Sequence, residues 1–134
     1  MLPIVFFPDV EQWAVEYLRS ELSAMTHPAT ENVTVATEVP NPRHERMVII
    51  RRDGGQQLDY ARELARFGIR IWAPTEEEAS DLARAVRAIM AASPGVGPVR
   101  RYVEISGPTR VNDESGSALR YFVCELTVRS VESL

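Results

Sequence analysis

The side chains that could carry chemistry are few and scattered. His27 and His44 are the two histidines, and neither has a second histidine or a carboxylate at a spacing typical of a metal site. Cys124, the single cysteine, lies in an apolar strand pattern, which favours a buried, unreactive thiol over a catalytic one. The sequence therefore predicts no catalytic residue and no metal site.

Two segments resemble the start of ligand-binding sites, but their sequence context argues against that role. Gly95-Val96-Gly97-Pro98 starts like a dinucleotide loop, yet Arg100 stands in place of the third glycine and the segment follows a helix pattern. Glu76, Glu77 and Glu78 fall in a first helical turn, where the helix dipole alone accounts for acidic side chains. No cofactor is expected, and the chain is not expected to be an enzyme.

Polar stretches beside apolar strands are the remaining candidates, and they indicate a surface that contacts other proteins. One follows the apolar residues 47–50 and consists of Arg51, Arg52, Asp53, Gly54 and Gly55. The other lies at the tip of a predicted loop and consists of Asn112, Asp113, Glu114 and Ser115. The arginine doublet fits a solvated strand end, a cross-strand ion pair or a contact with an acidic partner, because arginine forks suit carboxylates.

Composition and charge predict one globular domain over residues 1–134. Hydrophobic residues make up 45% of the chain and charged residues 25%, which is ordinary for a folded domain. The net charge of −4 argues against electrostatic binding of nucleic acid, because such binding needs a basic protein surface. Residues 1–8 lack the basic region of a signal peptide and are too short to span a membrane, so we expect an arm that docks on its own domain or a neighbour.

Two amphipathic helices are predicted from spacing and capping signals. The first begins after Asp9, with Gln12 as the reciprocal capping partner, and its apolar stripe runs to Met25. The second begins after Thr75, with Glu78 as its partner, and ends at residues 93–95. Each apolar stripe is expected to pack on a sheet.

Period-two alternation predicts strands over residues 33–39, 47–52, 67–73, 99–106 and 119–130. The first two are expected to be antiparallel neighbours, Gly54-Gly55 to take the chain out of the sheet, and residues 107–117 to form a loop. Residues 56–66 fit either a short helix or a loop packed along the sheet. Together the elements predict an α+β fold, with a mixed, mainly antiparallel sheet of about five strands packed by two helices.

Several segments, taken in order, resemble tail terminator proteins of long-tailed (siphovirus-type) bacteriophages. They are Pro8-Asp9-Val10-Glu11, Val39-Pro40, residues 51–55, Trp72-Ala73 before a Glu- and Ala-rich helix, Gly107-Pro108, Asp113 and Arg120-Tyr121. The resemblance spans most of the chain, depends on the order and spacing of these segments, and does not extend to residues 56–66.

The resemblance implies a structural virion protein, made in the host cytoplasm and placed at the head–tail junction. Such proteins form a hexameric ring that caps the head-proximal end of the tail tube and ends polymerisation of the major tail tube protein. The ring then joins the head–tail stopper or neck protein, and genomic DNA passes through its lumen without sequence-specific binding. No membrane is involved. On this hypothesis, residues 112–117 and the turn at residues 51–55 contribute to the two axial faces of the ring.

Two other classes stay open. One is a different phage neck component, such as a head–tail stopper or adaptor, which would bind the portal rather than the tube end. The other is a small ligand-binding or enzymatic α+β domain that uses Arg and Glu side chains in a cleft. A pocket with convergent carboxylates and a shifted pKa would favour that second class.

Overall fold

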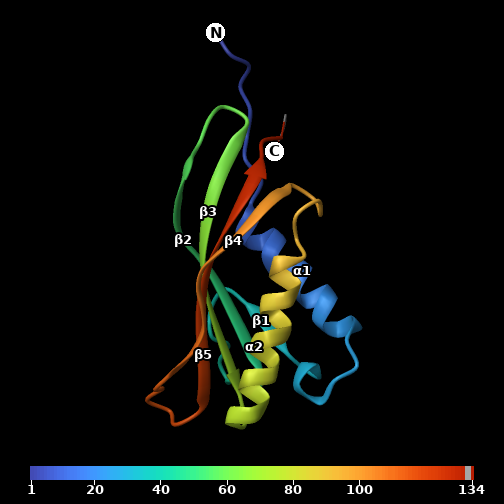
Figure 1. Ribbon diagram of the computed structural model, residues 1–134, viewed down its shortest axis with the longest axis vertical. Helices are drawn as coiled ribbons and strands as arrows, with labels where there is room; N and C mark the ends of the chain where they lie inside the picture. Colours follow the sequence, from blue (N-terminus) through green and yellow to red (C-terminus); the bar gives the residue numbers. More distant parts are fainter. Residues whose placement is uncertain (132–133) are drawn as a thin grey trace.

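The computed structural model describes residues 1–131 and 134. The elements in chain order are α1 (Val10–Ala24), the 3-10 turn η1 (Pro28–Thr30), β1 (Thr34–Ala36), β2 (Met47–Gln57), β3 (Arg62–Ala73), α2 (Glu76–Ala91), β4 (Val99–Val111) and β5 (Ala118–Arg129). The strands form one sheet in the order β1-β2-β3-β5-β4. Both helices cover the same face of this sheet (Figure 1), so the α+β prediction is confirmed.

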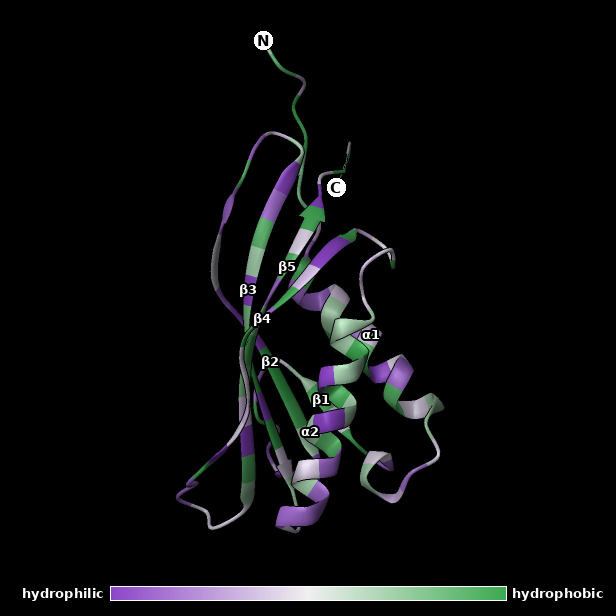
Figure 2. Ribbon diagram, in the orientation of Figure 1, coloured by the Kyte–Doolittle hydropathy of each residue, from purple (hydrophilic) through white to green (hydrophobic). Residues whose placement is uncertain are grey.

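The core lies between the sheet and the helices. Alternation along the strands turns one row of apolar side chains toward the helices, and Ile50, Ile69 and Phe122 are opposite one another on β2, β3 and β5. All three are fully buried among the apolar stripes of α1 and α2. Figure 2 shows the same division, with hydrophobic residues along the central strands and polar residues toward the loops.

Both helices begin at the predicted caps. Asp9 Oδ1 accepts a hydrogen bond from the Gln12 backbone N–H at 3.1 Å, and Thr75 Oγ1 accepts one from Glu78 at 3.1 Å. The prediction that the Gln12 and Glu78 side chains bond back to their cap residues is wrong. The Gln12 side chain donates to Glu16 instead, and the Glu78 carboxylate pairs with Arg46. Other charged partners compete for these two side chains.

The predicted antiparallel pairing of the first two strands is wrong. β1 is parallel to β2, with Thr34 opposite Met47 and Ala36 opposite Ile49. A parallel pair needs a connection that crosses the sheet. Residues 37–46 provide it by passing over the face that carries no helix, where the Arg43 guanidinium lies 5.4 Å from the centre of the Trp72 ring.

Gly54 and Gly55 do not leave the sheet, so that prediction is wrong. They continue β2 through a bulge after Arg52, with φ angles of 148° and 115°. The helix and loop interpretations of residues 56–66 are wrong as well. Only residues 58–61 form a turn, while β3 begins at Arg62. Asp59 closes this turn by accepting from the Ala61 backbone N–H and from Arg62, both at 2.9 Å, and local turn chemistry outweighs helix propensity.

The predicted loop at residues 107–117 is shorter than expected. β4 runs through Gly107-Pro108 to Val111, so only residues 112–117 connect it to β5. Pro108 is tolerated because β4 is an edge strand, and the register shifts around Ser106 relax the pairing there.

The molecule is elongated and its two ends differ. In Figure 1 the β2–β3 hairpin projects beyond the helices at the end that also holds both termini, and the β4–β5 loop lies at the opposite end. The arm over residues 1–8 docks on its own domain through Phe6, which exchanges backbone hydrogen bonds of 2.8 and 2.6 Å with Val131. Within the described part of the chain, neither helix is long and apolar enough to cross a membrane.

Candidate functional site

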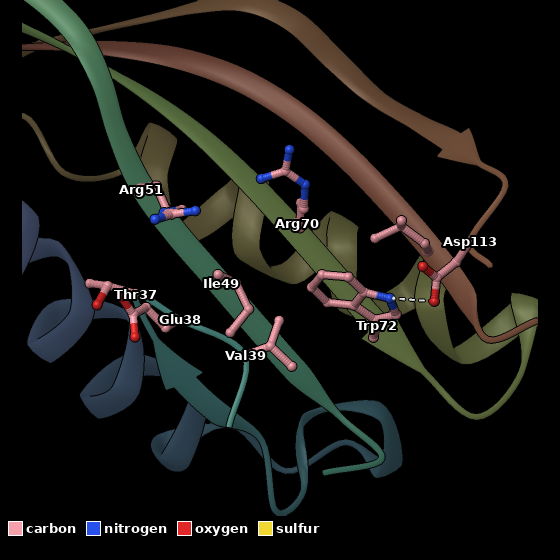
Figure 3. A pocket seen from close by; sticks show the side chains of 9 residues that line it. Thr37, Glu38, Val39, Ile49, Arg51, Arg70, Trp72 and Asp113 are labelled. Atoms are coloured by element: carbon pink, nitrogen blue, oxygen red, sulfur yellow. Dashed lines mark hydrogen bonds between the residues drawn. The ribbon is translucent and has the colours of Figure 1, made fainter. Parts of the chain in front are cut away.

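A groove runs along the face of the sheet that carries no helix. Its main hollow has a volume of about 530 Å³ and lies between residues 37–39 and the side chains of Ile49, Arg51, Arg70, Trp72, Leu119 and Asp113 (Figure 3). A second hollow of about 320 Å³ shares Arg51 and Arg70 and continues toward Asp53, Gly68 and Tyr121. We refer to the two hollows together as the groove.

Strand register brings the groove residues together. Arg70 of β3 lies opposite Ile49 of β2 on one side and opposite Tyr121 of β5 on the other. Successive strand residues point to opposite faces of a sheet, so Arg51 faces the groove while its neighbour Arg52 faces the helices. The arginine doublet is thereby divided between the two faces.

Arg52 has a structural role. Its backbone N–H donates to Glu11 of α1 at 2.7 Å, and its guanidinium forms an ion pair with Glu63 of β3. For Arg52 the expected cross-strand ion pair is therefore confirmed. The Glu11 hydrogen bond ties β2 to the helix layer, and the ion pair ties β2 to β3.

Arg51 and Arg70 are exposed and carry free charge. Within residues 1–131 and 134, no carboxylate lies in ion-pair distance of either guanidinium. Arg70 is held by stacking over the ring of Tyr121, 5.1 Å from its centre. A Cβ on Gly68 would come within 2.7 Å of the Tyr121 hydroxyl, so the glycine leaves room for that ring. Arg70 is thus an oriented cation and Arg51 a second exposed one, in hollows that Glu38 and Asp53 also line.

Asp113 anchors the β4–β5 loop to the groove. Its carboxylate accepts a hydrogen bond from Trp72 Nε1 at 3.1 Å and another from Ser115, and Arg43 lies 3.7 Å away. The Ser115 hydrogen bond, followed by those from Trp72 and Arg43, holds the pKa of Asp113 below its ordinary value. Asp113 therefore joins the loop to the crossover segment at residues 37–46.

Replacing Asp113 with alanine is expected to lower the free energy of unfolding by about 1–2 kcal/mol, because a charge-assisted hydrogen bond is lost. The folded pKa is depressed, so this stabilisation is complete above the ordinary Asp pKa of about 3.9 and is lost as pH falls through the lower folded value. In a Trp13→Phe background, Trp72 emission should report loop release at neutral pH. Asp113→Asn, which keeps an acceptor, serves as the control. If the stability of the Asp113→Ala variant fell with pH as steeply as that of the unmodified chain, this role of Asp113 would be contradicted.

The predicted interface residues are only partly brought together. Arg51 and Asp113 line the same hollow, and Ser115 holds Asp113 in place. Asn112 and Glu114 are exposed on the loop. Asp53 lines the second hollow, whereas Gly54 and Gly55 follow β2 away from the groove. The expectation of a turn at residues 51–55, at an end of the molecule, is wrong, because these residues continue β2.

Sequence reasoning missed Arg70, Trp72 and Tyr121 as groove residues. One signal was present, because Arg70 is a lone charge inside the otherwise apolar segment 69–73. A charged residue in such a strand marks the face that is not packed by helices.

The opposite end of the sheet presents exposed apolar side chains. At the hairpin tip, residues 58–61, Leu58 and Tyr60 are 41% and 48% exposed and flank Asp59. Leu2 and Ile4 of the arm are also exposed. A hollow of about 620 Å³ separates the arm from the tip and is lined by Pro3, Val5 and Tyr60 among others.

The reactive side chains have local roles. Cys124 is buried as predicted, and burial raises the pKa of its thiol to about 12. His27 Nδ1 accepts from the Ala29 backbone N–H at 3.0 Å, and His44 Nδ1 lies 2.6 Å from the Thr34 hydroxyl. Among residues 1–131 and 134, no group of three or more His, Cys, Asp or Glu side chains is placed to hold a metal ion.

No protein-family model matches this sequence, and no curated protein matches it. The resemblance to tail terminators therefore stays a prediction from the sequence.

Proposed function

We propose that this chain is a subunit of a hexameric ring that caps the head-proximal end of a phage tail tube and joins it to the neck. The observation that carries the proposal is the difference between the two ends of the long sheet (Figure 1). A terminator must match the tube on one rim and present another surface on the opposite rim. A polar loop lies at one end, and exposed apolar side chains of the tip and the arm, such as Leu58 and Ile4, lie at the other, which fits that requirement.

The edges of the sheet also suit a ring. A closed ring requires one patch of each subunit to meet a different patch of the next. Within the described residues, no strand pairs with the outer side of β4, and none pairs with the outer side of β2 beyond Ile49, where Glu11 of α1 binds the Arg52 backbone N–H. These two edges differ in sequence and lie on opposite sides of the sheet, which supports contacts between unlike patches.

In this proposal the β4–β5 loop contributes to one axial face. Its anchoring on Trp72 keeps the connection ordered, while Asn112 and Glu114 remain free to contact a flat protein end. The partners are the major tail tube protein on one side and the stopper or neck protein on the other. DNA passes through the lumen, and the net charge of −4 does not favour its retention.

The test is polymerisation of the tail tube protein of the same phage in the presence of this chain. The intact chain should bind one tube end and shorten the tubes, as seen by electron microscopy. A variant in which Asn-Gly replaces residues 112–117 should fold but cap poorly. Normal capping by that variant would show that the loop is not part of the interface with the tube. Binding to the portal in place of the tube end would indicate an adaptor and overturn the proposal.

A further inference from the structure

We propose that, in the ring proposed above, the β4 side of one copy packs against the β2 side of the next copy, with equal levels of the two sheets in contact. The β4 side consists of β4 and arm residues 1–5. The β2 side consists of residues 53–58 and the crossover at residues 37–46. The inference specifies the subunit contact of the ring and rests on the assembly step of the proposed function.

The symmetry of a ring decides which levels meet. The proposed rims are the two ends of the long sheet, so the ring axis runs along the strands. Rotation about that axis keeps equivalent residues of all copies at one height, and a closed ring joins unlike patches. Pairing across the sheet places Gln56 of β2 level with Arg101 of β4, and Met47 of β2 level with Val111 of β4.

Both sides lack a neighbouring strand at these levels within residues 1–131 and 134. No strand pairs with the outer side of β4, and none pairs with the outer side of β2 beyond Ile49. Glu11 of α1 binds the Arg52 backbone N–H, so the part of β2 that is open to a neighbour begins at Asp53. Register shifts around Ser106 interrupt β4, and we therefore expect packing of side chains rather than one continuous ladder of hydrogen bonds.

The free charge of the β4 side is positive at the levels of residues 53–57. Arg100 and Arg101 are exposed, and within the described part of the chain no carboxylate lies in ion-pair distance of either guanidinium. Glu104, the acidic residue of β4, is already paired with Arg87 of α2. This part of β4 therefore attracts an acidic surface.

The β2 side supplies an acidic group close to that height. Asp53 is the one charged residue among residues 53–57, and its side chain is 46% exposed. Its contact with Arg66 of β3 is long, at 3.8 Å. Across the sheet, Asp53 is level with residues 103–104 of β4, a few residues from Arg101. Opposite charges thus lie at neighbouring levels of the two sides.

Exposed apolar side chains match at the end that holds the β4–β5 loop. Val111 is exposed and ends β4 at the level of Met47. Val39 of the crossover is exposed as well, and it lines the same hollow as Ile49, shortly after Met47 along β2 (Figure 3). Contact between Val111 of one copy and Val39 of the next would remove both side chains from water.

The arm continues the β4 side beyond the first residue of β4. The backbone N–H groups of Arg129 and Val131 point to the same side of β5, the first to Pro98 just before β4 and the second to Phe6 of the arm. On the other side of β5, the Ser130 N–H donates to the hairpin tip. Arm and tip therefore lie at the same end of the sheet but on opposite sides (Figure 1).

Arm and tip expose apolar side chains that are separated within one chain. Leu2 and Ile4 are exposed on the arm, and Leu58 is exposed on the tip. The hollow of about 620 Å³ lies between the arm and Tyr60 of the same copy. Because the arm is on the β4 side and the tip follows β2, neighbours in the ring bring the arm of one copy to the tip of the next.

Cysteine cross-linking tests the match of levels directly. Proteins with one introduced cysteine, in a Cys124→Ala background, are mixed in pairs and treated with a short bifunctional thiol reagent. Gln56→Cys with Arg101→Cys and Val39→Cys with Val111→Cys are the level-matched pairs and should give covalent heterodimers. Gln56→Cys with Val111→Cys is the control, because those levels are about 30 Å apart. No cross-linking, or equal cross-linking of matched and control mixtures, would overturn the proposal.

Acidic substitution of the apolar contact provides the second measurement. Ile4→Asp and Leu58→Asp should each weaken self-association about tenfold or more in sedimentation experiments, because each places an unpaired carboxylate in the contact. The circular dichroism spectrum should stay unchanged. Met25→Asp makes the same charge change at an exposed position that follows α1 in the helix layer, and it should associate like the unmodified chain. Equal association of all these proteins, or none by the unmodified chain, would refute the contact.

The outcomes separate this contact from the proposed function. If the level-matched pairs cross-link but the assemblies do not cap tubes, the contact stands and the tail-terminator proposal falls. If the unmodified chain caps tubes and the Ile4→Asp and Leu58→Asp variants assemble and cap equally well, the function stands and the contact falls.

Discussion

Replacing Phe122 with alanine is expected to lower the free energy of unfolding by about 3–5 kcal/mol. Phe122 is fully buried and lies opposite Ile69 in the central row of the sheet, beneath both helices. Its removal takes away apolar contacts and leaves a cavity that the paired strands cannot close. Stabilities of small domains are about 5–15 kcal/mol, so a large share would be lost. Urea unfolding followed by circular dichroism measures the change.

A graded control separates the cavity from other effects of the substitution. Phe122→Leu keeps most of the apolar volume and should cost clearly less than Phe122→Ala. Both measurements should be made at low protein concentration, where assembly does not add to the free energy of unfolding. Equal and small losses for the two variants would show that the Phe122 ring does not fill the centre of the core.

Replacing Gly55 with alanine is expected to separate the distal half of the β2–β3 hairpin. Gly55 has a φ of 115°, and a Cβ there would lie 2.0 Å from the Leu64 carbonyl oxygen and 3.0 Å from the Ala65 Cα. These are backbone atoms of the paired strand, so β2 and β3 must move apart. Hydrogen exchange should become fast in residues 56–64 while amides near Ile69 stay protected.

Gly54 supplies the matched control, because it has positive φ without crowding. Its φ is 148°, and a Cβ added there would have no described atom within 4 Å apart from those of its chain neighbours. Gly54→Ala should therefore cost only backbone strain, about 1–3 kcal/mol, and leave the hairpin paired. Loss of protection to the same extent in both variants would place the cause in the bulge and not in the contact with Leu64.

The hairpin is the element in which a substitution is expected to impair assembly without unfolding the core. Its tip lies beyond the helices, so loosening it leaves the core row around Phe122 packed (Figure 1). Gly55→Ala should then impair self-association while the helices and the central strands remain folded. Phe122→Ala should instead weaken both together.

Local signals in the sequence were sufficient where one short segment decides the structure. Asp9 and Thr75 start the helices because each cap bonds a backbone N–H three residues ahead. Alternation in residues 119–130 placed Phe122 and Cys124 on the buried face, as observed. These features depend on neighbours within a few residues, so they can be predicted without the fold.

Contacts between residues distant in the sequence decided the features that the local signals did not predict. Residues 62–66 have helix propensity, yet they pair with β2 on one side and β5 on the other, and those hydrogen bonds outweigh propensity. The parallel direction of β1 follows from the crossover at residues 37–46, which no local pattern encodes. Arg51 was a candidate from sequence, but its neighbour Arg70 was not, because only strand register brings them into one groove.

By itself the sequence determined an α+β fold with two capped helices, a buried thiol and mainly antiparallel strands. Only the tertiary structure decided that Arg51 and Arg52 serve opposite faces and that Asp113 reaches Trp72, 41 residues away along the chain. The physical reason is that periodicity and capping act within one or two turns of chain. A groove between strands depends on register and crossover direction, which are set by packing across the whole sheet.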